Sequence, residues 1–142
     1  MGFRKDAAVM RIEHFALNVA EPVAMARWYG EHLGMRIVVG SNEPPYGHFL
    51  ADCGGADGTI YVMIEIYHNP ADAIPDYAAQ PPARMHLAFV SADPAGDRDR
   101  LLAAGAGYVE DVHLPDGGYI VTLRDPWGLP LQLVKRGTPL LL

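Results

Sequence analysis

Residues 11–19 alternate between two sets of side chains. One set holds Glu13, Phe15, Leu17 and Val19, and the other holds Ile12, His14, Ala16 and Asn18. Successive side chains of a strand point to opposite faces, so this pattern predicts a strand whose more apolar first set lies under a helix. His14 is then expected on the opposite face, beside the small side chain of Ala16.

The stretch from His14 to Pro22 returns 72 residues later, from His86 to Pro94. Histidine recurs on histidine, alanine on alanine, and an acid followed by proline on an acid followed by proline. A repeat architecture would need more copies at a shorter period. We interpret the pattern as a duplicated module in which each copy opens with a strand that carries one histidine.

Each module is predicted to run strand, helix, strand, strand, strand. Prolines at 22 and 94 suit the first position of a helix, and glycines at 34 and 105 suit its end. The first module is expected to have strands at 11–19, 35–39, 47–51 and 60–67 and a helix at 21–33. The second is expected to have strands at 85–90, 108–113, 119–124 and 129–134 and a helix at 94–104. The predicted fold class is α+β, with two paired βαβββ modules whose mixed sheets curve into a cup.

One domain, residues 1–142, is expected, because a chain of this length can bury roughly two-thirds of its unfolded surface in one core. Its modules are residues 10–68 and 84–136. Between them, residues 69–83 hold four prolines and no sustained period, which indicates a linker with a helical turn near 74–78. A linker of this length lets the modules pack within one chain or exchange with a partner chain.

Polar residues recur in the last strand of each module as well. Glu65 lies between two isoleucines, and Gln132 lies between two leucines. The less apolar strand faces therefore carry four duplicated polar side chains: His14, Glu65, His86 and Gln132. Two imidazoles, one carboxylate and one amide suit a divalent metal. A carboxylate among apolar neighbours is also costly to bury unless it is paired or ligated. The sequence therefore predicts a metal site.

Composition and charge exclude several classes of function. The net charge is −6 and no basic stretch exists, which argues against nucleic acid as a partner. The single Cys53 rules out a disulfide within the chain and fits a reducing compartment. Charged residues at 4–6 interrupt the N-terminus before a signal peptide could form, and no apolar run approaches the ~18 residues of a membrane span. We expect a cytoplasmic protein with no membrane partner.

Four segments resemble the vicinal oxygen chelate superfamily, which includes glyoxalase I, the fosfomycin and bleomycin resistance proteins, methylmalonyl-CoA epimerase and the extradiol dioxygenases. The resemblance covers about residues 10–136 and rests on segments 12–17, 28–35, 86–89 and 123–128. It implies paired βαβββ modules that form a cup around a metal, usually in a homodimer. The metal positions of the superfamily fall on His14, Glu65, His86 and Gln132.

Gln132 departs from the pattern of the superfamily. In glyoxalase I and the epimerase, the resemblance implies a glutamate there, which is both metal ligand and proton-transfer base. An amide cannot serve as a base near neutral pH. Glu65 then supplies the carboxylate and is the expected catalytic base, with Gln132 as a weak ligand or a hydrogen-bonding group for substrate. The expected cofactor is a divalent ion, one of Ni, Zn, Co, Mn or Fe.

Three functions stay open. The first is a metal-dependent lyase, isomerase or epimerase that stabilises an enediolate-like state of a small substrate with adjacent oxygens. The second is an Fe(II)-dependent dioxygenase, because two histidines and one carboxylate suit non-haem iron. The third is a resistance-type protein that sequesters a ligand without catalysis, which the loss of the usual glutamate favours. Tyr67, His113 and Tyr61 are the candidate substrate-binding residues.

Overall fold

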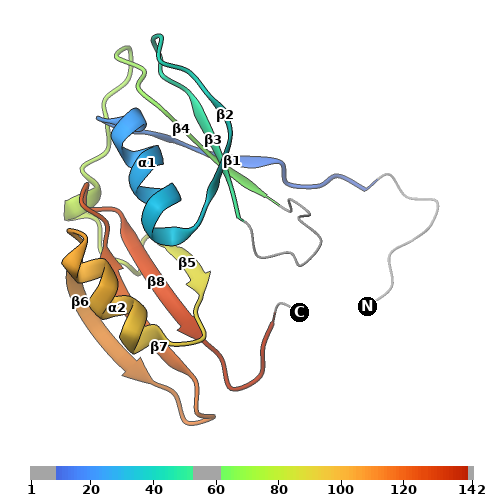
Figure 1. The fold of residues 1–142 in the computed structure, drawn as a ribbon, viewed down its shortest axis with the longest axis vertical. Coiled ribbons are helices and arrows are strands. Elements are labelled where there is room, and N and C mark those ends of the chain that lie inside the picture. Colours follow the sequence, from blue (N-terminus) through green and yellow to red (C-terminus); the bar gives the residue numbers. More distant parts are fainter. Residues whose placement is uncertain (1–8, 53–61, 141–142) are drawn as a thin grey trace. The chain divides into compact units, whose positions relative to one another are not determined.

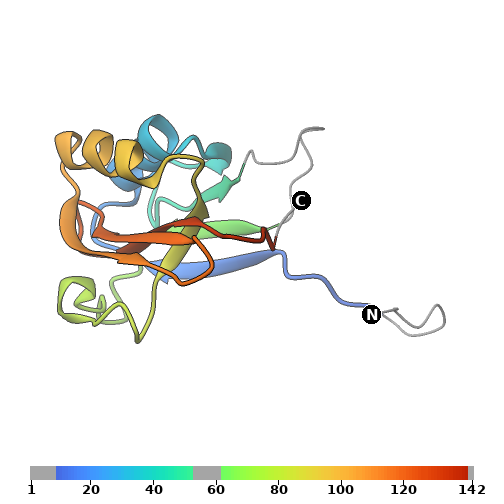
Figure 2. The same cartoon turned by 90° about the horizontal axis from the view of Figure 1, so that it is seen from below.

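The chain folds as two compact units, each with a four-stranded sheet and one α-helix over one face of that sheet (Figures 1 and 2). The structure is a computed structural model, and it describes residues 9–52 and 62–140. The units are Met1–Ile74 and Pro75–Leu142, so their boundary falls within the predicted linker. The predicted fold class, α+β with two mixed-sheet βαβββ modules, is confirmed.

In the first unit the described elements follow the predicted order. They are β1 (His14–Asn18), α1 (Pro22–Leu33), β2 (Arg36–Gly40), β3 (His48–Ala51) and β4 (Met63–Tyr67). Their order across the sheet is β1-β4-β3-β2. β1 pairs with β4 in parallel, and the other neighbours are antiparallel. The parallel pair needs a long crossover, and α1 with β2 and β3 provides it.

Helix α1 begins and ends where the sequence predicts. Pro22 occupies the start, where its missing N–H costs little, and Gly34 ends the helix in a left-handed conformation with φ 69°. One side of α1 is buried, and it includes Met25, Trp28 and Tyr29. These side chains pack against a sheet face whose central residues, among them Leu50 and Ile66, are fully buried. The burial of this apolar surface stabilises the unit.

Phe15 differs from its predicted environment. The alternating set to which Phe15 belongs also includes Leu17 and Val19, which are buried as expected, but Phe15 itself is 51% exposed. The physical reason is that β1 is an edge strand, while α1 packs mainly over β2, β3 and β4. The start of β1 therefore projects past the helix.

The second unit repeats the arrangement of the first. Its elements are η1 (Tyr77–Ala79), β5 (Leu87–Val90), α2 (Pro94–Ala103), β6 (Gly107–His113), β7 (Tyr119–Arg124) and β8 (Pro130–Lys135). The order across the sheet is β5-β8-β7-β6, again with one parallel pair, β5 and β8. The short 3₁₀ turn η1 lies close to the helical turn expected near 74–78.

Helix α2 is fixed at its start by side-chain capping. Asp93 accepts a hydrogen bond from the Gly96 backbone N–H at 3.1 Å, which satisfies one of the unpaired donors of the first turn. Leu101 is fully buried against the sheet, together with Val121 and Leu131. Within the described residues, neither α1 nor α2 is long and apolar enough to cross a membrane.

Candidate functional site

The two sheets place Glu65 and Gln132 at equivalent positions. On β4, Glu65 pairs directly with Ala16 of β1, and on β8, Gln132 pairs directly with Ala88 of β5. In each unit the module's histidine stands two residues before that alanine. Residues two apart share a strand face, and the small alanine leaves room between them. The duplication seen in the sequence therefore places a histidine, an alanine and a polar residue in the same arrangement in each unit.

In the first unit, His14 and Glu65 approach each other across β1 and β4. The Nε2 atom of His14 lies 3.7 Å from Oε1 of Glu65, which is too long for a hydrogen bond. The side chains are 37% and 23% exposed, so both are accessible. Two ligand atoms that share one metal at about 2.1 Å lie about 3.0–3.4 Å apart at ordinary angles. The observed spacing exceeds this by only a few tenths of an ångström.

The other ring nitrogen of His14 is held by a carboxylate. Nδ1 lies 3.0 Å from Oε1 of Glu13, and a carboxylate can only accept, so Nδ1 carries the proton. In the neutral ring this leaves the lone pair on Nε2, the nitrogen that is turned toward Glu65. The arrangement is the one that a metal-binding histidine requires.

Phe49 is a residue of this surface that the sequence reasoning missed. It pairs with Glu65 across β3 and β4, and its ring meets the His14 ring edge to face at 5.4 Å and 85°. The alternation of strand 47–51 shows that Phe49 and His48 face opposite ways, but it does not show that Phe49 pairs with Glu65. The neighbouring His48 lies on the opposite, helix-covered face with its Nδ1 2.8 Å from the Tyr46 carbonyl, and it is 6% exposed.

In the second unit, His86 stands immediately before β5 and is exposed. Its Nδ1 lies 2.8 Å from the backbone carbonyl of Pro82. A carbonyl can only accept, so this nitrogen donates and Nε2 again keeps the lone pair. Both histidines therefore present the same ring nitrogen, although a side chain holds one and a backbone carbonyl holds the other.

The amide of Gln132 is oriented by a neighbouring hydroxyl. Its Nε2 donates to Oγ1 of Thr122 on β7 at 3.4 Å, and Thr122 is almost fully buried. The amide nitrogen offers only N–H donors, one of which meets Thr122, so the amide oxygen is the atom that a metal or a substrate donor could meet. The register places Gln132 opposite Thr122, and this local pairing was not visible in the sequence.

The structure distributes the predicted substrate-binding residues unevenly. Tyr67 ends β4 two residues after Glu65, on the same face, and is half-buried. Tyr61 lies outside the described residues. His113 does not share a face with Gln132, because its partner Tyr119 belongs to the set of β7 that contains Val121, and Gln132 pairs with Thr122. The rings of His113 and Tyr119 stack at 4.3 Å and 2°.

His113 borders a charged cluster on the face that α2 covers. Arg98 of α2 donates from Nη1 to Oδ2 of Asp111 at 2.7 Å, and the Tyr119 hydroxyl donates to the same oxygen. The hydrogen bond from Tyr119 is the main cause that holds the pKa of Asp111 below its usual range, and the same bond raises the pKa of Tyr119. These contacts hold α2 against β6 and β7, and none of the predicted metal ligands takes part in them.

The proposed ligands offer the nitrogen and oxygen donor atoms that a divalent metal prefers. One unit offers an imidazole and a carboxylate, and the other offers an imidazole and an amide. Nitrogen and oxygen donors of this set suit Zn, Ni, Co, Mn or Fe(II). Within 9–52 and 62–140, no three His, Cys, Asp or Glu side chains gather closely enough to hold a metal.

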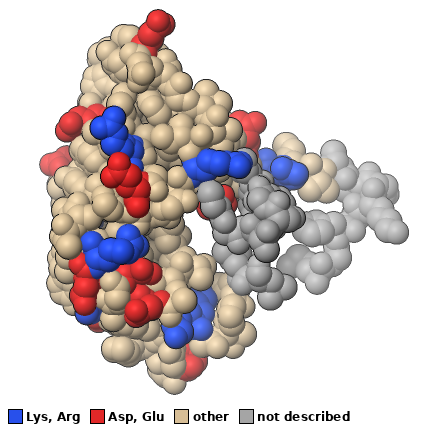
Figure 3. Space-filling model, viewed as in Figure 1, with Lys and Arg blue, Asp and Glu red and all other residues tan. Residues whose placement is uncertain are grey.

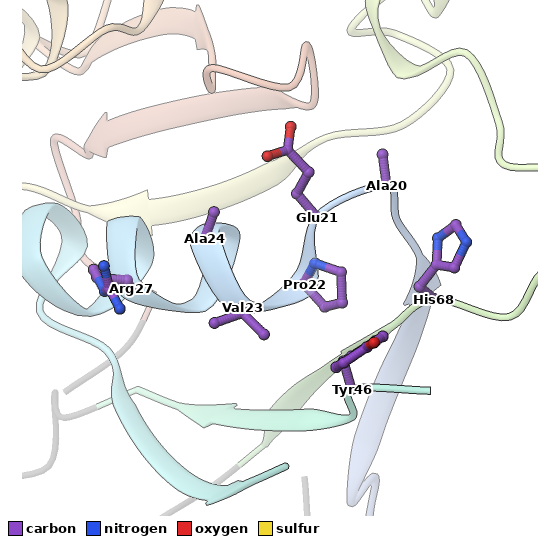
Figure 4. Close-up of a pocket in the computed structure, with 8 residues that line it drawn as sticks. All are labelled: Ala20, Glu21, Pro22, Val23, Ala24, Arg27, Tyr46 and His68. Atoms are coloured by element: carbon purple, nitrogen blue, oxygen red, sulfur yellow. The ribbon is translucent and has the colours of Figure 1, made fainter. Parts of the chain in front are cut away.

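A pocket lies in the first unit at the start of α1, and none of the predicted site residues lines it. It has a volume of about 370 Å³ and is bordered by Tyr46, His68 and residues 20–24 and 27. In Figure 4 Pro22 and Val23 point toward the Tyr46 ring, whereas Glu21 points away. His68 is held through Nδ1, 2.9 Å from the Val19 carbonyl. The pocket is thus separate from the His14 and Glu65 pair.

Charge is dispersed over the face of the protein seen in Figure 3. Basic side chains stand apart from one another there, and acidic side chains lie among them. A nucleic-acid site would need Lys and Arg gathered along one surface. This face offers no such surface.

Comparison with known proteins identifies the family. A family model described as a glyoxalase-like domain matches residues 14–134. The chain is 27% identical to the lactoylglutathione lyase of Haemophilus influenzae over 128 residues, which are 89% of this chain and 93% of that protein.

Solved structures share the fold. A glyoxalase-related enzyme from Fulvimarina pelagi superposes with a TM-score of 0.65 at 20% identity, over 89% of this chain and 88% of that one. The antibiotic-binding protein TnmS3 from Streptomyces sp. CB03234 superposes with a TM-score of 0.63 at 18% identity, over 89% of this chain and 96% of that one. Together with the family match, these likenesses confirm the resemblance noted in the sequence: the chain belongs to the glyoxalase-like domain family, within the vicinal oxygen chelate superfamily.

Proposed function

We propose that the chain is a metal-dependent enzyme of lyase or isomerase type that acts on a small substrate with adjacent oxygens. The observation that carries the proposal is the His14 and Glu65 pair, in which an imidazole Nε2 and a carboxylate stand 3.7 Å apart on accessible strand faces. Similarity to lactoylglutathione lyases supports this class of chemistry.

His14, Glu65, His86 and Gln132 are the proposed metal ligands. When bound, a divalent metal supplies a Lewis acid that polarises adjacent substrate oxygens and stabilises negative charge on them. The two neutral imidazoles contribute no charge, so Glu65 alone reduces the ion's charge from +2 to +1. The site keeps a net positive charge for an anionic oxygen.

Glu65 is the proposed base. With substrate bound, Glu65 would no longer be a metal ligand. Its carboxylate would take the proton from the substrate carbon that bears the hydroxyl and return it to the neighbouring carbonyl carbon, while the hydroxyl proton passes to the other oxygen. General-base catalysis of this kind contributes about 10²–10⁴-fold in rate. Gln132 cannot take this role, because its amide does not accept a proton near neutral pH. Gln132 would instead hydrogen-bond substrate or act as a weak ligand through its oxygen.

Phe49 and Tyr67 are proposed to border the substrate. Phe49 packs its ring against His14, and Tyr67 lies on the Glu65 face at the end of β4. Aromatic rings beside a reacting group exclude water from it. The proposed homodimer, cytoplasmic location and single-domain organisation stay predictions.

A second candidate is a binding protein that holds a ligand without catalysis. Two observations favour it: Gln132 stands where the resemblance implies a catalytic glutamate, and an antibiotic-binding protein shares the fold. In that case the same surface would hold a small molecule, and substitution of Glu65 would leave binding largely unchanged.

The test is an assay for formation or cleavage of lactoylglutathione, and for proton exchange in other small hydroxycarbonyl compounds, with the metal identified by elemental analysis. We expect Glu65→Gln to lower the rate at least about 100-fold while the protein stays folded. Glu31→Gln, which removes a carboxylate beside His32 on α1, is the matched control. Turnover that survives Glu65→Gln would contradict the proposed base, and bound Fe with oxygen consumption would favour a dioxygenase.

A further inference from the structure

Arg124, at the end of β7, bonds to three backbone carbonyls. Its Nη1 donates to the Tyr77 carbonyl at 3.1 Å and to the Gly128 carbonyl at 3.0 Å, and its Nη2 donates to the Gln80 carbonyl at 2.9 Å. All three bonds are partly buried. A guanidinium is a planar fork that remains charged, so such bonds are stronger and more directional than those between neutral groups.

The bonded carbonyls belong to two segments. Tyr77 and Gln80 lie in the stretch before β5, and Gly128 lies in the turn between β7 and β8. The two segments also touch directly, because a Cβ added at Gly128 would stand 2.6 Å from the Cβ of Ala78. Arg124 and Gly128 together thus dock residues 77–80 onto the end of β7.

The docked stretch continues to the carbonyl that orients His86. Two residues after Gln80 stands Pro82, whose carbonyl accepts from Nδ1 of His86 at 2.8 Å. The intervening chain is tightened by a turn in which the Arg84 N–H donates to the Pro81 carbonyl at 2.9 Å. The position of the Pro82 carbonyl therefore depends on the segment that Arg124 holds.

We propose that Arg124 is a positioning residue for His86. It fixes residues 77–80, the fixed segment places the Pro82 carbonyl, and that carbonyl keeps the proton on Nδ1 and turns Nε2 outward. The importance of this for metal binding rests on the proposed function, because it takes His86 as a ligand. In the first unit a side chain has this role instead, because Glu13 accepts the hydrogen bond from Nδ1 of His14.

The direct test is the tautomer of His86 in the metal-free protein, read from ¹⁵N chemical shifts of the imidazole rings. In the wild type we expect the proton on Nδ1 of His86. Arg124→Gln should shift His86 toward the other tautomer or a mixture, whereas His14, held by Glu13, should not change. Arg84→Gln is the matched control, because Arg84 lies in the same stretch but its guanidinium donates to the Gln80 side chain rather than to a backbone carbonyl.

Affinity for Zn²⁺, measured by competition with a chelator, is the second readout. Loss of an outer-shell partner typically weakens metal binding about 10–100-fold, and we expect this for Arg124→Gln but not for Arg84→Gln. Arg124→Lys keeps the charge without the fork and should show a smaller effect of the same sign, and it replaces Arg124→Gln if that variant does not fold.

The outcomes separate this inference from the proposed function. An unchanged His86 tautomer in a folded Arg124 variant would overturn the positioning role, whatever the metal affinity. A shifted tautomer supports that role even if the wild type binds no Zn²⁺, and absence of binding would count against the proposed metal site instead.

Discussion

At the scale of single residues, the two modules carry different side chains at one pair of equivalent positions. Glu65 and Gln132 occupy the same register opposite an alanine, yet one is a carboxylate and the other an amide. A carboxylate contributes charge to a metal and can take a proton, while an amide contributes only a weak oxygen donor. The chemistry of the proposed site is therefore concentrated in the first module.

Gln132→Glu tests whether position 132 faces the metal. A second carboxylate there should tighten Zn²⁺ binding at least about tenfold, or about 1.4 kcal/mol. Chelator competition measures the effect, and Thr138→Glu, at an exposed position after β8, adds the same charge elsewhere in the unit as a control. Equal affinities for the wild type and Gln132→Glu would remove Gln132 from the ligand set.

A pair of glycines tests the contact between η1 and the β7–β8 turn. Gly117 and Gly128 have φ values of 88° and 91°, but a methyl group at Gly117 would meet nothing within 4 Å, whereas one at Gly128 would meet Ala78. Gly117→Ala should cost roughly 1–2 kcal/mol of unfolding free energy from backbone strain. Gly128→Ala should cost roughly 1–3 kcal/mol more, because the methyl group overpacks against Ala78. Denaturant unfolding of the two variants gives the difference, and equal costs would contradict the close packing.

At the scale of elements, proline and glycine made the helices predictable. Pro22 and Pro94 start helices α1 and α2, and alternation together with the turn residues between strands located the eight strands of the described residues to within a few residues. These are local signals that depend on backbone sterics and on which face is apolar. The order of elements along the second module followed from the duplication, whereas the order of strands across each sheet comes from the structure.

Two features at this scale were beyond local signals. Strand β6 has polar residues on both faces and an irregular register between Tyr108 and Glu110, so the sequence did not indicate which face holds His113. Phe49 was missed because its importance comes from pairing with Glu65, a contact between distant parts of the chain. Face assignment in such strands depends on tertiary packing rather than on composition.

The cluster around Asp111 gives stability a defined pH dependence. Its pKa is lowered in the folded protein, first by the Tyr119 hydroxyl and also by Arg98. The resulting stabilisation is therefore present above the pKa of the unfolded side chain, about 3.9, and is lost as the pH falls through the folded pKa. Asp111→Asn should unfold at lower denaturant concentration than the wild type at pH 7. The difference between their unfolding midpoints should become smaller at acid pH.

Asp99→Asn is the control for this prediction, because Asp99 also bonds Arg98 but is largely exposed. An exposed ion pair contributes little, so its removal should leave the unfolding midpoint nearly unchanged. If the difference in unfolding midpoint between the wild type and Asp111→Asn stays constant from pH 7 to acid pH, charge in this cluster does not stabilise the fold.

At the scale of the whole molecule, duplication accounts for both fold and proposed chemistry. Each unit folds around its own helix and sheet, and each presents one histidine with Nε2 available and one further polar side chain. The proposed ligands are thus divided equally between the units. The family could be recognised from the sequence because the duplicated motifs set where strands, helices and turns lie, and these define the fold. The reaction depends instead on a few side chains, which vary within the superfamily.

The most direct test of the central claim is the metal content of protein purified without chelators, compared with a His14→Ala, His86→Ala double variant. We predict an equimolar amount of divalent metal in the wild type and its loss in a folded double variant. Protein that contains no metal and takes up none on titration with Ni²⁺, Zn²⁺, Co²⁺, Mn²⁺ or Fe²⁺ would contradict the proposed enzyme and leave the binding protein as the better description.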